Sequence, residues 1–139
     1  MIELPLFLCI KEQNMKILIL EDNLSRQEFF KVNLEKHNLT ITDSSKVTIE
    51  KLSTEKWDIL FLDHDLGGQV HVESGENTGY EVAKFLEQNK KFMPLNIIVH
   101  SLNVVGAKNI INALPNAFHI PFAWDKKNSD LIVKICSSN

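Results

Sequence analysis

The sequence lacks the features that mark several large classes of protein. Its 15 lysine and arginine residues are outnumbered by 18 acidic ones, and a formal net charge of -3 leaves no basic surface for extended duplex nucleic acid. A small nucleotide or an RNA end held at one metal site needs no such surface. The two cysteines, Cys9 and Cys136, follow no metal or redox spacing and are too few for a disulfide framework. We therefore expect a reducing, cytoplasmic compartment.

The apolar segment near the N-terminus, residues 4–10, is too short to cross a membrane. It also lacks the basic start and the small-residue cleavage site of a signal peptide. Met15 begins a more natural first strand, so we expect residues 1–14 to be an N-terminal extension and residues 15–139 to form one domain. Internal repeats and low-complexity segments are absent from the sequence.

Short apolar runs alternate with amphipathic segments along the chain. Strands are expected at residues 16–20, 39–42, 59–62, 95–99 and 117–120. Five helices are expected. Two begin at capping boxes, at Ser25 and Glu28 and at Thr78 and Glu81; one runs from Ser44 or Ser45 to Leu52. The last two cover residues 104–114 and 127–135, and the latter is expected to bury Leu131, Ile132 and Ile135. A strand-helix alternation repeated five times predicts an α/β fold with a doubly wound, five-stranded parallel sheet.

Three of these strands run directly into polar clusters. Residues 59–62 precede Asp63, His64 and Asp65; residues 16–20 precede Glu21 and Asp22; residues 95–99 precede His100 and Ser101, with Asn103 two positions further on. Open α/β sheets bind their ligands at the carboxyl ends of their strands. Carboxylates grouped there are suited to Mg²⁺, which prefers oxygen ligands and keeps several waters. The spacing predicts a metal site around Asp63.

This ordered set of residues resembles the receiver domains of response regulators. The acidic pair Glu21-Asp22, then Asp63, then Ser101 stand after the first, third and fourth strands, as in that family. The resemblance covers residues 15–136 and implies a three-layer, flavodoxin-like sandwich with strand order 2-1-3-4-5. It also implies that Asp22 and Asp63 hold Mg²⁺, that Asp63 accepts a phosphoryl group, and that Ser101 contacts the phosphoryl oxygens.

One position departs from the receiver pattern. Receivers carry a lysine before the proline that follows the fifth strand, and this chain has Ile120 there, which supplies no charge and no donor. In addition, the combinations Asp63-His64-Asp65 and His100-Ser101-x-Asn103 resemble a divergent receiver-like family described as cyclic-phosphate-processing receivers. That resemblance implies action on cyclic phosphate ends or nucleotides, in RNA repair or conflict systems.

Each candidate residue also has a purely structural interpretation. Asp65 comes shortly before two glycines and suits a turn. The Asp63-x-Asp65 spacing also resembles that of haloacid-dehalogenase-type phosphatases, which implies a general acid at Asp65. Ser101 and Asn103 suit helix caps as well as phosphate contacts. His64 and His100 suit proton transfer or hydrogen-bonded packing. Side chains alternate along a strand, so neighbours of site residues should point elsewhere unless a turn redirects them.

The sequence favours a Mg²⁺-dependent phosphoesterase that acts on the cyclic phosphate of a nucleotide or RNA end. Glu21, Asp22 and Asp63 would bind the metal, and His64, Asp65 or His100 would move protons. Either Asp63 attacks phosphorus itself or a water molecule activated by the metal does. The alternatives are an atypical single-domain receiver that signals through phosphorylation or a protein partner, and a domain that binds a nucleotide without turnover.

Overall fold

The structure is a computed structural model that describes residues 14–66, 72–123 and 126–137. Its elements, in order, are β1 (Lys16–Leu20), α2 (Leu24–Asn33), β2 (Asn38–Thr42), α3 (Ser45–Thr54), β3 (Ile59–Leu62), α4 (Gly79–Gln88), the 3₁₀ turn η1 (Lys90–Phe92), β4 (Asn96–Val99), α5 (Val104–Ala113), β5 (Phe118–His119) and α6 (Lys126–Ser137). The expected alternation of strands and helices is confirmed.

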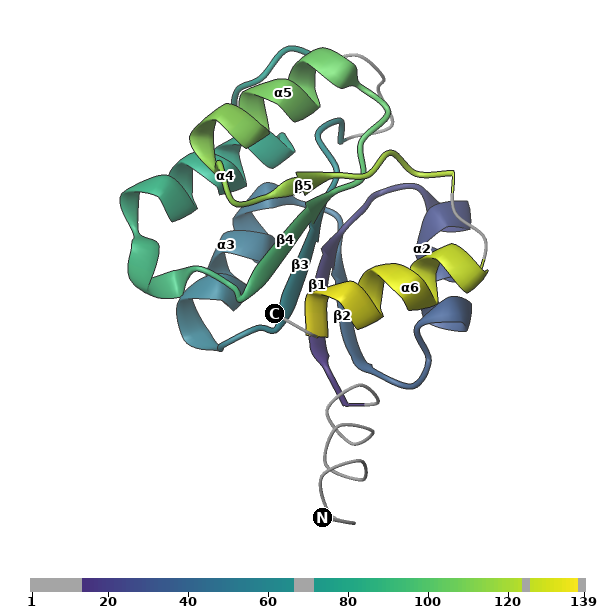
Figure 1. Cartoon of the computed structure of the whole chain (residues 1–139). Coiled ribbons are helices and arrows are strands. Elements are labelled where there is room, and N and C mark those ends of the chain that lie inside the picture. Colours follow the sequence, from purple (N-terminus) through teal and green to yellow (C-terminus); the bar gives the residue numbers. More distant parts are fainter. Residues whose placement is uncertain (1–13, 67–71, 124–125, 138–139) are drawn as a thin grey trace.

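The five strands form one parallel sheet in the order β2-β1-β3-β4-β5. Helices α3, α4 and α5 cover one face of this sheet, and α2 and α6 cover the other (Figure 1). The predicted doubly wound sandwich and its strand order 2-1-3-4-5 are therefore confirmed.

The two faces of the sheet bury two separate hydrophobic cores, which explains the unbroken apolar run of β3. Leu60 and Leu62 pack into the core under α3, α4 and α5, whereas Ile59 and Phe61 pack into the core under α2 and α6. All four side chains of β3 are buried. A strand covered on both faces needs apolar residues at every position rather than at alternate ones.

Three details of the helices differ from the prediction. Helix α2 is capped by Asn23, whose side chain accepts from Arg26 N at 3.0 Å, so the expected cap at Ser25 is wrong by two residues. Thr78 precedes α4, but its hydroxyl donates back to Gly75 O at 2.7 Å instead of capping the helix. The Glu81 carboxylate correspondingly accepts from Asn77 N at 2.9 Å rather than from the N–H of Thr78.

The buried face of α6 was also assigned wrongly. Ile132, Val133 and Cys136 are buried, whereas Leu131 and Ile135 are 53% and 52% exposed. Two overlapping sets of apolar residues have helical spacing here, and periodicity alone does not distinguish them. The buried set, Ile132, Val133 and Cys136, is the predicted set shifted by one residue along the helix.

Residues 1–13 lie outside the described part of the chain, so the expected N-terminal extension stays a prediction. Within the described ranges, no helix has both the length and the apolar character needed to cross a bilayer.

Candidate active site

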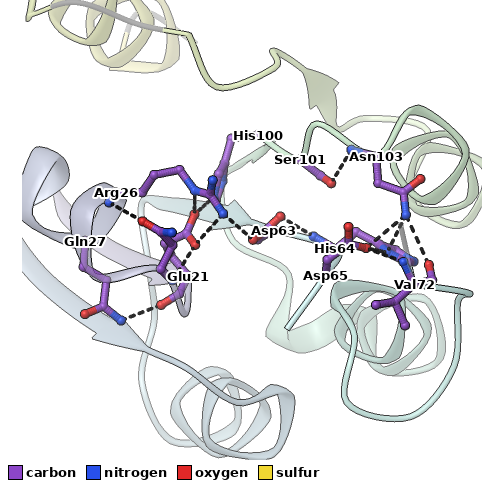
Figure 2. A network of polar contacts seen from close by, with 11 residues as sticks. Glu21, Arg26, Gln27, Asp63, His64, Asp65, Val72, His100, Ser101 and Asn103 are labelled. Atoms are coloured by element: carbon purple, nitrogen blue, oxygen red, sulfur yellow. Dashed lines mark hydrogen bonds and ion pairs between the residues drawn. The ribbon is translucent and has the colours of Figure 1, made fainter. Parts of the chain in front are cut away.

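Three side chains converge at the carboxyl edge of the sheet, one from the end of each central strand (Figure 2). Glu21 follows β1, Asp63 follows β3, and His100 follows β4. Strand-like hydrogen bonds continue past the strand ends, from Asp63 N to Leu20 O (3.1 Å) and from His100 N to Leu62 O (3.0 Å). The three residues are 0%, 4% and 1% exposed, and one ligand atom of each lies within 4.8 Å of the others. Neighbouring parallel strands have therefore brought two carboxylates and an imidazole together in a buried site.

Arg26, from the first turn of α2, bridges the two carboxylates. Its Nε lies 2.8 Å from Glu21 Oε1 and its Nη2 lies 3.2 Å from Glu21 Oε2. The same Nη2 lies 3.6 Å from Asp63 Oδ2. His100 Nε2 lies 2.9 Å from Glu21 Oε1, and a carboxylate only accepts, so this ring nitrogen carries the hydrogen. Glu21 is thus fully engaged, while Asp63 is bound more loosely.

The pKa values of the two carboxyl groups are shifted in opposite directions as a result. Burial alone would raise the pKa of Glu21, but hydrogen bonds from His100 and Arg26 outweigh it and lower the pKa from 4.5 to about 2. Burial raises the pKa of Asp63 from 3.8 to about 6, with His100 and Arg26 opposing the rise and the Glu21 carboxylate adding to it. Asp63 Oδ2 is buried and accepts no hydrogen bond among the described residues. A carboxylate in this condition would gain strongly from a nearby cation.

This group is the only set of three His, Cys, Asp or Glu side chains within metal-binding distance in the described ranges. Its two carboxylates suit Mg²⁺, and its imidazole nitrogen is a ligand more typical of transition metals. Asp22, also expected to bind the metal, is half-buried and lies outside this group of three. It is near enough to act on the site electrostatically: the pKa of Arg26 is raised first by its hydrogen bond with Glu21, and the charges of Glu21, Asp63 and Asp22 add to the rise. The residues present therefore fit a divalent cation.

A second polar cluster lies on the other side of Asp63, towards α5. His64 is completely buried, and its Nδ1 lies 2.7 Å from Asp65 Oδ1. The Asn103 side-chain amide donates to Asp65 Oδ1 at 3.0 Å, while its Oδ1 caps α5 by accepting from Gly106 N at 2.9 Å. Ser101 is buried and its Oγ accepts from Asn103 N at 3.0 Å. These four residues, predicted as one site with Asp63, thus form a cluster beside the metal-type group.

The two histidines are therefore divided between the clusters. His100 joins Glu21 and Asp63, and His64 joins Asp65 and Asn103. The expected alternation of side chains explains this division, because adjacent residues at a strand end leave on opposite faces.

Two glycines give the second cluster its room. A Cβ at Gly106 would lie 2.4 Å from Cγ of the His64 ring, so the ring rests against bare helix backbone. A Cβ at Gly79 would lie 1.9 Å from the Asp63 carbonyl oxygen, and Gly79 N donates to His64 O at 3.0 Å. Both positions therefore require a residue without a side chain, because they lie against Asp63 or His64, the first two residues after β3.

Sequence reasoning missed two contributions to the site. The role of Arg26 as a bridge between carboxylates had only a weak signal, its position in the first turn of the helix after an acidic pair. Ser74 lies 2.8 Å from His64 Nε2 through its Oγ, and it had no signal beyond its place in a long polar loop. Ile120, in the position of the receiver lysine, donates its backbone N–H to Val99 O and packs its side chain against the core under α2 and α6.

The sequence profile of the cyclic-phosphate processing receiver domain family matches residues 16–116. The chain belongs to this family. The resemblance drawn from Asp63-His64-Asp65 and His100-Ser101-x-Asn103 is thereby confirmed. None of the curated proteins compared with the chain matches it.

Solved receiver domains share the fold of this cyclic-phosphate processing receiver domain. The receiver domain of a sensor histidine kinase from Pseudomonas aeruginosa, with a magnesium ion coordinated in its active-site cleft, superposes with a TM-score of 0.73 at 15% identity, over 91% of this chain and 99% of that one. A CheY-like receiver domain protein from Methanospirillum hungatei superposes with a TM-score of 0.70 at 16% identity, over 91% and 94%. At these identities the likeness establishes the fold.

Proposed function

We propose that this domain is a metal-dependent phosphoryl-processing enzyme that opens the cyclic phosphate of a nucleotide or an RNA end. The observation that carries the proposal is the Asp63 carboxyl group. It is buried beside Glu21 and His100, it has an oxygen that accepts no hydrogen bond among the described residues, and burial raises its pKa to about 6. Perturbed carboxyl groups of this kind are typical of functional sites.

Glu21 and Asp63 would hold Mg²⁺, with Asp22 as a further ligand and His100 able to contribute a nitrogen. A bound Mg²⁺ neutralises the negative charge that develops on phosphoryl oxygens during transfer. The solved receiver of similar fold from Pseudomonas aeruginosa carries a magnesium ion in its cleft, which supports this choice of cation.

Arg26 is the fixed cation of the site. The receiver lysine is replaced by Ile120, whose partly buried side chain packs against the core under α2 and α6. The guanidinium of Arg26 lies 3.6 Å from the open oxygen of Asp63 and is held there by two contacts to Glu21. Guanidinium groups bind phosphoryl oxygens well because they offer several fixed donors. Arg26 therefore supplies from α2 the positive charge that receivers supply after the fifth strand.

The neighbouring side chains orient the phosphoryl group and move protons. Ser101 Oγ accepts from Asn103 N, which leaves its hydroxyl hydrogen for a phosphoryl oxygen. Asp63 would position the phosphoryl group through the metal that it holds, and His64, Asp65 and His100 are the groups within this edge that transfer protons.

The alternative function is a receiver that signals through phosphorylation of Asp63 or through a protein partner. The receiver fold and the position of Asp63 after β3 favour it. Ile120 opposes it, because that residue contacts no group of the site that the structure records and carries no charge to sense a phosphoryl group.

Phosphorus NMR tests the proposal. The purified protein is incubated with Mg²⁺ and separately with 2′,3′-cyclic nucleotides, 3′,5′-cyclic nucleotides, RNA ends with cyclic phosphate, and acetyl phosphate. We expect a cyclic-phosphate resonance to be replaced by that of a phosphomonoester with wild type and not with Asp63→Asn. Asp43→Asn is the matched control, because Asp43 follows β2 and is exposed.

The other outcomes separate the alternatives. An acyl-phosphate signal from acetyl phosphate, with the cyclic compounds unchanged, would contradict the enzyme and support the receiver. No change in any substrate would also contradict the enzyme and would leave a binding domain.

A further inference from the structure

Hydrogen bonds connect Asn103, Asp65, His64 and Ser74 in a chain, and the donor of each bond can be assigned. The amide nitrogen of Asn103 lies 3.0 Å from Asp65 Oδ1, 3.1 Å from Val72 O and 3.4 Å from His64 Nδ1, and its two hydrogens go to the two nearer oxygens. The contact of 2.7 Å between His64 Nδ1 and Asp65 Oδ1 therefore takes its hydrogen from the imidazole, because a carboxylate only accepts. With Nδ1 as the donor, Nε2 is the ring nitrogen that is left to accept a hydrogen bond.

Ser74 completes the chain. Asn109 Nδ2 donates to Ser74 Oγ at 2.9 Å, so the hydroxyl hydrogen of Ser74 is left for another acceptor. That acceptor is His64 Nε2, at 2.8 Å. The order carboxylate, imidazole and hydroxyl is the arrangement in which a base activates a nucleophile and a third group orients the base.

Packing holds this arrangement in place. The His64 ring is 0% exposed and rests on the backbone at Gly106, where a Cβ would come within 2.4 Å of it. Ser74 is only half-buried, in the segment before α4, whereas His64 is completely buried. The base is therefore held inside the protein, and the residue that carries the hydroxyl is partly exposed.

We propose that Ser74 is a nucleophile that accepts a phosphoryl group, with His64 as its general base and Asp65 as the residue that orients His64. The identity of the natural phosphoryl donor, a cyclic phosphate, rests on the proposed function, whereas the reactivity of Ser74 does not depend on it. No recorded hydrogen bond joins Glu21 to these side chains, and Asp63 reaches His64 only at the backbone, where its Oδ1 accepts from His64 N at 2.8 Å. An asparagine at position 63 keeps an oxygen that can accept this bond.

A small pocket lies between α4 and α5 and shares Asn109 with the hydrogen bonds of Ser74. It has a volume of about 210 Å³ and is lined by Tyr80, Lys84, Glu87, Asn109, Asn112 and Ala113. The polar lining and small volume suit a phosphate ester or the sugar that carries it better than a large apolar ligand.

The covalent step balances with the groups in place. Ser74 Oγ forms the new bond to phosphorus and gives its proton to His64 Nε2. The bond from phosphorus to the departing ester oxygen breaks, and that oxygen takes the proton from His64. In a cyclic phosphate the departing oxygen stays attached to the ribose. Water then attacks the phosphodiester that joins Ser74 to the ribose and gives a proton to His64. Ser74 Oγ leaves with that proton, and the ribose phosphomonoester is released.

Diisopropyl fluorophosphate tests the nucleophile without any natural substrate. Ser74 Oγ would displace fluoride from phosphorus, and the proton would leave with the fluoride. The adduct is followed by intact mass and located by peptide mapping. We expect one adduct at Ser74, formed at least about 100-fold faster than at Ser53, because general base catalysis typically contributes that factor. Ser53 is exposed and donates to Ile49 O, with no histidine contact recorded, so it is the internal control.

Variants test the base and its orientation. Ser74→Ala should abolish the adduct, and Asp65→Asn and His64→Gln should slow it by about 100-fold or more while circular dichroism shows a folded protein. Labelling at Ser74 that is absent, or that is as fast in folded Asp65→Asn as in wild type, would overturn the inference. If His64→Gln does not fold, Asp65→Asn alone decides.

Asp63→Asn separates this inference from the proposed function. It should leave the labelling of Ser74 unchanged while it abolishes the turnover of cyclic phosphate. Labelling of Ser74 without turnover by wild type would refute the proposed function and support the nucleophile. Turnover by wild type with no labelling of Ser74 would refute the nucleophile alone.

Discussion

Replacing Asp63 by asparagine should stabilise the metal-free protein at neutral and alkaline pH. Burial raises the pKa of this carboxyl group from 3.8 to about 6, so the folded state disfavours its charged form. One pKa unit corresponds to about 1.4 kcal/mol, and a shift of about two units therefore corresponds to about 3 kcal/mol. Asparagine has nearly the same shape and no charge to bury.

The gain should depend on pH with a defined sign. Below pH 3.8 the carboxyl group is protonated in both the folded and the unfolded protein, so wild type and Asp63→Asn should be equally stable. As the pH rises from 3.8 to about 6, the unfolded state ionises more readily than the folded state, and wild type loses stability. Above pH 6 the full difference of about 3 kcal/mol should separate the two proteins.

Urea denaturation in EDTA at pH 4, 6 and 8 measures this difference. Mg²⁺ should then stabilise wild type and not Asp63→Asn, by an amount that grows with the logarithm of its concentration. Equal stabilities of the two proteins at pH 8 in EDTA, or a less stable variant, would refute the account of Asp63 as a buried, poorly paired carboxylate. Asp43→Asn, at an exposed position, should change stability by less than about 0.5 kcal/mol at each pH.

Three further predictions concern stability. Glu21→Gln should lower the free energy of unfolding by about 3 kcal/mol at pH 7, because the lowered pKa of Glu21 contributes stability above pH 4.5. That contribution is lost as the pH falls towards 2, so a destabilisation of similar size at pH 2 would contradict the reasoning. Gly106→Ala should destabilise by about 1–3 kcal/mol in thermal unfolding and slow the labelling of Ser74, because its Cβ would displace the His64 ring; normal labelling would contradict the packing. Ile132→Ala should cost about 2–4 kcal/mol in urea and Ile135→Ala less than about 1 kcal/mol. An equally large cost at Ile135 would restore the face of α6 predicted from the sequence, which contained both residues.

Much of the fold could be predicted because local patterns and global topology agree. The continuous apolar run at residues 59–62 signals a strand buried on both faces, and the five alternations of strand and helix permit few topologies. The face of α6 could not be predicted, since Leu131, Ile132 and Ile135 have the same spacing as Ile132, Val133 and Cys136, which are the residues that are buried. Only the position of the neighbouring helix selects between them.

The site was predicted in outline for the same reason. Parallel strands end at one edge, so Glu21, Asp63 and His100 had to be near one another. The sequence did not show that Arg26 would reach both carboxylates, because that depends on the direction of α2. It also did not show that Ser74 would meet His64, because a separation of ten residues without a helical or strand pattern in the sequence does not determine the distance between two side chains.

Magnesium binding measured by titration calorimetry tests most directly whether Asp63 is the centre of the site. Wild type and Asp43→Asn should bind Mg²⁺ with the same affinity, and Asp63→Asn should bind at least about tenfold more weakly, since it loses a charged ligand. An unchanged affinity in Asp63→Asn would contradict the metal site at the end of β3 and with it the phosphoryl chemistry proposed for this domain.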